Sequence, residues 1–156
     1  MGSLSIRKNL KWIAEHAQKY PENFYAISSK PLPDVVAPKL ELLRTLKNVK
    51  FLDYLSDEEV KAVISKCKVF IFPSYFEGFG LLPLEALSGG SPIIISNTIC
   101  LREIYANTAH YIDPDNSDID LDKLLQEPVA SPKELLEKLT VKNSEKELYS
   151  ILKDYL

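Results

Sequence analysis

The chain has 156 residues, of which 46% are hydrophobic and 26% charged, and its formal net charge is −3. This length suits about one domain with a sizeable core, and the weak negative charge argues against non-specific binding to nucleic acid. No apolar run approaches the roughly 20 residues of a membrane-spanning helix, and the amino terminus does not read as a signal peptide. We therefore expect a cytoplasmic protein, with peripheral contact at the inner face of the membrane as an open alternative.

Stretches typical of helices and strands alternate along the chain. Residues 5–20 carry apolar side chains at helical spacing and stop at Pro21, and Ser56 with Glu59 forms a capping box that opens a helix at 56–67. The apolar runs at 68–74 and 91–96 predict strands that are buried on both faces. The remaining expected elements are strands at 23–28, 48–55 and 109–113, helices at 36–46 and 99–107, and a short helix after Gly80.

This alternation predicts an α/β fold, a three-layer doubly wound parallel sheet of the Rossmann-like kind. We expect one such domain over residues 1–126 and a helical extension over 127–156, in which prolines separate the helical pieces. The chain enters its first helix almost at once, whereas a domain of this kind has a strand before that helix. The sequence therefore suggests a fragment, or a first strand that is missing or supplied from elsewhere.

Unusual residues follow the predicted strand at 68–74, on the sheet edge where open parallel sheets bind ligands. Gly78 and Gly80 would let a ligand approach the backbone, and the amides of Gly80, Leu81 and Leu82 would be unpaired donors at a helix start. Together with the helix dipole, these amides predict an anion site, typically one for phosphate.

Two carboxylates flank this helix start. Glu85, which we place in the first helical turn, has a structural explanation, because a carboxylate favours the positive end of a helix. It could instead accept hydrogen bonds from a pair of sugar hydroxyls. Glu77 lies in the glycine turn, eight residues earlier, and does not share a helix face with Glu85. Two carboxylates that flank a phosphate site suit a ligand with hydroxyls on both sides of its phosphates, and a sugar nucleotide is such a ligand.

The stretch PSYFEGFGLLPLEALSGGSPIIIS resembles the nucleotide-sugar-binding half of retaining glycosyltransferases with two Rossmann-like domains, the GT-B fold. The family is the large one that includes sucrose and glycogen synthases. Its signature is two glutamates with seven residues between them, matched here by Glu77 and Glu85. Weaker similarity covers roughly residues 2–126.

The resemblance implies a role for each matching residue. Glu85 would bind the ribose hydroxyls, and Glu77 would lie beside the donor sugar. Lys8 and Arg7 would neutralise the diphosphate, with Arg7 in place of the arginine that many members carry where Ser3 stands. Without the resemblance, the two cations are explained as a solvated helix start. Backbone groups would complete the site, namely the amides of Gly78, Phe79, Gly80, Leu81 and Leu82 around the sugar and phosphates, and the backbone of Tyr54 and Leu55 at the base.

The implied activity is transfer of a hexose from a nucleoside diphosphate sugar to a saccharide or lipid-linked acceptor. These 156 residues are too few to contain the family's acceptor-binding half as well, so we expect a further domain or a partner subunit to supply it, and we expect the chain alone to be inactive. A sugar-nucleotide-binding module without activity is the alternative. An oxidoreductase is rejected because no G-x-G-x-x-G follows a predicted strand. The sequence shows no metal-ligand cluster and predicts no cofactor beyond the donor substrate.

Overall fold

The structure is a computed structural model that describes residues 6–28, 40–52 and 54–153. Ser3, residues 29–39 with the start of the helix predicted at 36–46, and Asp53 lie outside the described residues. The elements, in chain order, are η1 (Ile6–Lys8), α1 (Leu10–Lys19), β1 (Tyr25–Ser28), α2 (Leu40–Thr45), β2 (Val49–Leu52), α3 (Asp57–Lys66), β3 (Phe70–Phe72), α4 (Leu81–Ser88), β4 (Ile93–Ser96), α5 (Ile99–Tyr105), β5 (His110–Ile112), α6 (Leu121–Leu124), α7 (Lys133–Lys138) and α8 (Val141–Lys153).

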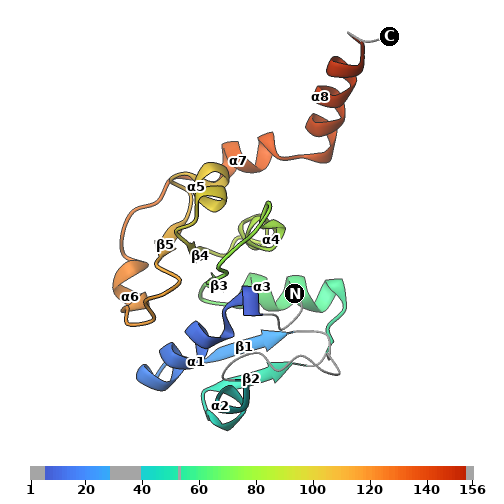
Figure 1. Cartoon of the computed structure of the whole chain (residues 1–156). Coiled ribbons are helices and arrows are strands. Elements are labelled where there is room, and N and C mark those ends of the chain that lie inside the picture. Colours follow the sequence, from blue (N-terminus) through green and yellow to red (C-terminus); the bar gives the residue numbers. More distant parts are fainter. Residues whose placement is uncertain (1–5, 29–39, 53, 154–156) are drawn as a thin grey trace.

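The strands are all parallel, and helices separate them in the sequence, so the predicted α/β fold is confirmed (Figure 1). They form two sheets instead of one. β1 pairs with β2, whereas β4 lies between β3 and β5. The registers pair Tyr25 with Val49 in the first sheet, and Ile71 with Ile94 in the second.

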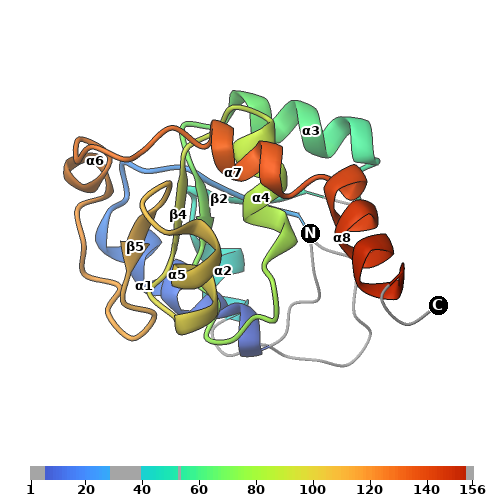
Figure 2. The ribbon, with the colours of Figure 1, turned by 90° about the horizontal axis from the view of Figure 1, so that it is seen from above.

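Helices cover both faces of the sheets, and two apolar clusters form the core. In β4, Ile94 belongs to the cluster that contains α1, α2 and α6, while Ile93 and Ile95 belong to the cluster of α3, α4 and α5. This alternation is what a strand buried on both faces requires. α7 packs Leu135 and Leu136 against the second cluster, whereas α8 extends away from the sheets (Figures 1 and 2). The division into residues 1–126 and 127–156 stays a prediction.

β3 is less buried than the sequence predicts. Its run reads as a strand buried on both faces, yet only Phe72 is buried, and Phe70 and Ile71 are half-buried. All four residues of β4 are buried. The difference arises because β4 has a strand on each side, whereas β3 pairs with β4 alone in the described part of the chain.

Local sequence signals explain where the helices begin. The predicted capping box of α3 is present: the Ser56 hydroxyl accepts a hydrogen bond from the Glu59 amide, and the Glu59 carboxylate accepts one from the Ser56 amide. α1 begins after Asn9, which has a left-handed backbone with φ 53° and accepts a hydrogen bond from the Trp12 amide. The Asn9 side chain also donates to the carbonyl of Pro114, 2.8 Å away, so it ties the start of α1 to the loop after β5.

Candidate functional site

The glycine turn before α4 has a fixed shape that depends on Gly80. This residue is the N-cap of α4 and has φ 76°, a left-handed conformation that favours glycine. A Cβ atom on Gly80 would lie 2.7 Å from the Leu101 side chain of α5. The Tyr105 hydroxyl of α5 donates a hydrogen bond to the Gly80 carbonyl over 2.5 Å. The turn is therefore locked against α5.

Gly78 differs from Gly80, because no atom lies within 4 Å of a Cβ built at Gly78. Glycine is not required there by the protein's own packing, and its backbone borders open space. The amides of Gly80, Leu81 and Leu82 form no hydrogen bond within the described part of the chain. These donors are available as the sequence predicts, and the anion site itself stays a prediction.

Glu77 lies at the centre of an ion-paired cluster. Its Oε1 atom accepts a hydrogen bond from Lys8 Nζ at 2.8 Å, and its Oε2 atom lies 2.5 Å from Arg7 Nη1. Lys8 and Glu77 are 69 residues apart in the sequence. The structure therefore brings together the three residues that the sequence predicts for the sugar and diphosphate, namely Glu77, Lys8 and Arg7.

The glutamate of this cluster is charged and largely covered. Glu77 exposes 9% of its surface. Burial acts to raise the pKa of Glu77, but the hydrogen bonds from Lys8 and Arg7 outweigh it, and the pKa lies below its usual value of 4.5. The cluster thus holds one carboxylate and two cations at neutral pH.

The basic turn that carries Arg7 and Lys8 is anchored to the loop after β3. The Tyr75 amide donates to the Arg7 carbonyl, and Arg7 Nη1 donates to the Phe76 carbonyl, both over 2.9 Å. The Lys8 ammonium lies 4.4 Å from the centre of the Phe72 ring, within the range of a cation–π contact. Backbone and side-chain contacts therefore hold the cations in place.

Glu85 has different surroundings. The helix begins at Leu81, after Gly80 as predicted, but Glu85 is its fifth residue and lies beyond the first turn of about 3.6 residues, so our placement of Glu85 in the first turn is wrong. Its side chain is exposed, and it borders a groove of about 630 Å³ between α3 and α4. Asp57, Val60 and Lys61 line the facing wall.

The structure brings the loop of Tyr54 and Leu55 to the beginning of α3, and hence to one end of this groove. Tyr54 is 57% exposed, whereas Leu55 packs against the second apolar cluster. Neither residue lines the groove itself, so their role at a nucleotide base stays a prediction.

Large apolar side chains surround the glutamate cluster, and the sequence analysis did not single them out as a surface. Four of them are at least 40% exposed, and they come from the glycine turn and the starts of α4 and α5. These residues are Phe76, Phe79, Leu81 and Ile99. The Cys100 thiol donates to the Gly78 carbonyl over 2.7 Å, which joins the start of α5 to the glycine turn. Exposed apolar patches of this kind commonly mark interaction surfaces.

Among residues 6–28, 40–52 and 54–153, no three His, Cys, Asp or Glu side chains gather as they would around a metal ion. No helix in the described part of the chain has the length and apolar composition needed to cross a bilayer.

Known proteins share this chain's fold. The structure of the sucrose-phosphate synthase from Thermosynechococcus elongatus superposes with a TM-score of 0.82 at 20% identity, over 100% of this chain and 45% of that one. The structure of a GtfA/B complex superposes with a TM-score of 0.71 at 16% identity, over 98% of this chain and 34% of that one. At such low identities the likeness shows the fold alone.

Curated proteins with similar sequences are more identical to this chain than the two solved structures are, but they match less of it. The O-antigen chain mannosyltransferase B of Escherichia coli is 35% identical over 78 residues, which are 50% of this chain and 20% of that protein. The MMP α-(1→4)-mannosyltransferase of Mycolicibacterium hassiacum is 36% identical over 84 residues, which are 52% of this chain and 20% of that protein. The chain thus spans about a fifth of the length of these relatives.

The family model named "Glycosyl transferases group 1" matches residues 1–146, nearly the whole chain. This match agrees with the glutamate signature at Glu77 and Glu85 and with the parallel α/β architecture. The chain belongs to the group 1 family of glycosyl transferases.

Proposed function

We propose that this chain is the donor-binding domain of a retaining glycosyltransferase that transfers a hexose from a nucleoside diphosphate sugar. The acceptor is a saccharide or a lipid-linked molecule. Membership of the group 1 family and the mannosyltransferases among the relatives support hexosyl transfer. The observation that carries the proposal is the pairing of Glu77 with Lys8 and Arg7 beside the free amides of α4.

The charges of this cluster suit a diphosphate next to a sugar. Two cations and one carboxylate leave a net charge of +1 beside a helix end that is itself partly positive. A diphosphate at Arg7 and Lys8 would draw them partly away from Glu77. The carboxylate would then accept hydrogen bonds from hydroxyls of the donor sugar, near the open backbone of Gly78.

In transfer, the bond between the sugar and the diphosphate breaks, and negative charge develops on the leaving group. Lys8, Arg7 and the amides at the start of α4, already in contact with the bound diphosphate, would stabilise this charge as it develops. The exposed carboxylate of Glu85 would hold the ribose hydroxyls at the groove between α3 and α4. No nucleophile or general base for the acceptor is assigned to these residues.

The acceptor would come from outside the described residues. The exposed apolar side chains of Phe76, Phe79, Leu81 and Ile99 surround the donor site, where a second domain or a partner subunit would close the cleft. The alternative function is a module that holds a sugar nucleotide without transferring it, and the isolated chain by itself would behave in that way.

Calorimetry with uridine and guanosine diphosphate sugars tests the donor site. We expect at least one of them to bind, with the same affinity in the presence of a chelator, because the cations that meet the diphosphate belong to the protein. The matched control is Glu41→Gln on α2, which removes an exposed carboxylate from the other sheet. Binding that disappears with the chelator would contradict a metal-free site, and no binding across the panel would contradict the proposed function.

A further inference from the structure

Two side chains of α5 donate hydrogen bonds to carbonyls of the glycine turn before α4. The Tyr105 hydroxyl donates to the Gly80 carbonyl over 2.5 Å, and the Cys100 thiol donates to the Gly78 carbonyl over 2.7 Å. The two carbonyls belong to alternate residues of the turn, and each is held from the same helix. The contacts join residues 25 and 22 positions apart in the sequence, so no local pattern explains them.

These bonds also fix the direction of two amides. The peptide bonds of the described residues are trans, and in a trans peptide unit the carbonyl and the amide point in opposite directions. The Gly80 carbonyl shares its peptide unit with the Leu81 amide, and the Gly78 carbonyl shares its unit with the Phe79 amide. Because α5 holds both carbonyls, the amides of Leu81 and Phe79 point away from α5. Neither amide forms a hydrogen bond within the described part of the chain.

The hydroxyl of Tyr105 lies where the core alone would not call for a polar group. Tyr105 is fully buried in the apolar cluster of α3, α4 and α5, where a hydroxyl is costly unless it is hydrogen-bonded. Burial raises the pKa of Tyr105, against the opposing effect of the Leu84 amide, so the hydroxyl stays protonated at neutral pH and remains a donor. The hydroxyl therefore serves the Gly80 carbonyl, whereas the ring serves the core.

α5 is itself anchored at its carboxyl end. The Thr108 hydroxyl donates to the Tyr105 carbonyl over 2.6 Å, and the Tyr111 hydroxyl of β5 donates to the Ala106 carbonyl over 2.7 Å. The Arg102 guanidinium lies 4.0 Å from the centre of the Tyr111 ring. The helix thus connects β5 to the glycine turn, and it can hold the turn in one orientation.

We propose that Tyr105 and Cys100 are positioning residues of the donor site: Tyr105 directs the Leu81 amide to the diphosphate, and Cys100 directs the Phe79 amide to the donor sugar. This inference rests on the proposed function and adds to it two side chains that act through the turn. An amide that already points at the ligand does not have to be ordered when the ligand binds. Without the Tyr105 hydroxyl, the peptide unit after Gly80 can rotate, because glycine accepts many backbone angles.

The first test measures binding of uridine and guanosine diphosphate and of the two bare nucleosides. Tyr105→Phe removes the hydroxyl and keeps the ring, so we expect it to weaken binding of the diphosphate by about five- to tenfold and to leave the nucleoside unchanged. The matched control is Tyr111→Phe, which removes a hydroxyl hydrogen bond from the other end of α5. The control should leave both ligands within about twofold of the wild type.

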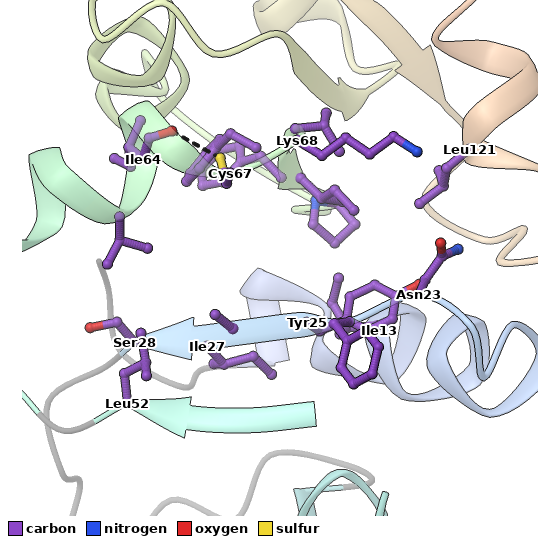
Figure 3. A pocket seen from close by; sticks show the side chains of 18 of the residues that line it. Ile13, Asn23, Tyr25, Ile27, Ser28, Leu52, Ile64, Cys67, Lys68 and Leu121 are labelled. Carbon is purple, nitrogen blue, oxygen red and sulfur yellow. Dashed lines mark hydrogen bonds between the residues drawn. The ribbon is translucent and has the colours of Figure 1, made fainter. Parts of the chain in front are cut away.

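The control is matched in its surroundings as well. Neither Tyr105 nor Tyr111 lines the groove that Glu85 borders. Neither lines the groove of about 600 Å³ between β1 and β3, where Ile27 lies on one side and Ile64 on the other (Figure 3). Both substitutions therefore leave the walls of these two grooves as they are, and a difference between them reports on the glycine turn.

A second readout follows the amides without any ligand. We expect an NMR order parameter of about 0.85 for the Leu81 amide in the wild type, as for rigid backbone, and a value below about 0.6 in Tyr105→Phe. Tyr111→Phe should not change it. Cys100→Ala should lower the order parameter of the Phe79 amide and weaken only the intact sugar nucleotide, and Cys100→Ser should restore both, because its hydroxyl can donate to the Gly78 carbonyl.

The outcomes separate this inference from the proposed function. Diphosphate binding that is unchanged in Tyr105→Phe, or weakened equally in Tyr111→Phe, would overturn the positioning role. Order parameters that stay at the wild-type value in Tyr105→Phe would overturn it with or without a ligand. A wild type that binds neither nucleoside diphosphate would instead contradict the proposed function, and the order parameters would then decide alone whether α5 fixes the two amides.

Discussion

Glu77 and Glu85 lie on either side of the amino end of α4, and they are the same residue type in very different surroundings. Glu77 is 9% exposed and pairs with Lys8 and Arg7. Glu85 is exposed, borders an open groove, and forms no ion pair within the described part of the chain. Glu77 therefore contributes to the folded structure as well as to the site, whereas Glu85 is available to a ligand at little structural cost.

The ion pairs of Glu77 affect how Lys8 and Arg7 could bind a phosphate. If Lys8 and Arg7 were unpaired, they would act only as phosphate-binding groups. Because both contact Glu77, a diphosphate bound as proposed would have to compete with the carboxylate for them. Glu77 would therefore tune the strength of the proposed phosphate site, in addition to its proposed contact with the sugar.

The largest expected effect is on sugar transfer, which we expect the two glutamates alone not to support. We expect the isolated chain to transfer no sugar, because the proposed donor site would face solvent and the acceptor would come from outside the described residues. Positioning of both substrates in a closed cleft supplies a large share of the rate of such reactions. The measurement is an assay of transfer and donor hydrolysis, with the chain alone and with an acceptor-domain partner. Efficient transfer by the chain alone would show that copies of this chain supply the wall.

The next largest effect is on the free energy of unfolding, which should respond differently to the loss of Glu77 and of Glu85. Glu77→Ala leaves Lys8 and Arg7 unpaired, and removing one partner of a fully buried pair costs about 3–5 kcal/mol. Because the Arg7 side chain is 42% exposed, we expect a smaller loss of about 1–3 kcal/mol in the free energy of unfolding. Glu85→Ala should stay within about 0.5 kcal/mol of the wild type, as for other exposed positions. Urea unfolding measures both, and equal losses would remove the distinction.

Ligand binding should reverse that order. Glu85→Ala should weaken binding of the bare nucleoside diphosphate by about 1–3 kcal/mol, since the ribose hydroxyls lose a charged acceptor. Glu77→Ala should spare the bare nucleotide or tighten it, because it frees the two cations, and should weaken only the intact sugar nucleotide. Calorimetry with both ligands is the measurement. If the two substitutions weakened the bare nucleotide alike, the proposed division of roles would be wrong.

The sequence predicted the elements well and their pairing less well. Apolar periodicity and the capping box at Ser56 located most helices and strands, because these signals are local. The pairing of Glu77 with Lys8 joins residues 69 positions apart, and no local pattern encodes it. The half-buried state of β3 was missed for a related reason, since its composition fits a central strand and only the neighbouring strands decide its burial.

The smallest expected effect is a difference in pH dependence that isolates Glu77. Its pKa is lowered in the folded chain, so its contribution to stability is present above the usual value of 4.5 and is lost as the pH falls through the folded pKa. Glu77→Gln should therefore flatten the fall in the free energy of unfolding below pH 4.5, whereas Glu85→Gln should leave that fall as it is in the wild type.

Two histidines also make the free energy of unfolding depend on pH, at higher pH than Glu77 does. Burial lowers the pKa of His16, whose ring stacks between Trp12 and Tyr20, and burial also lowers that of His110. The unfolded chain then binds protons that the folded chain does not, so stability begins to fall as the pH drops below the usual value of 6.5. Both glutamine variants keep this first fall, and only the second fall, below pH 4.5, should differ between them. A Glu77→Gln profile parallel to that of Glu85→Gln throughout would show that the Glu77 ion pairs do not stabilise the folded chain.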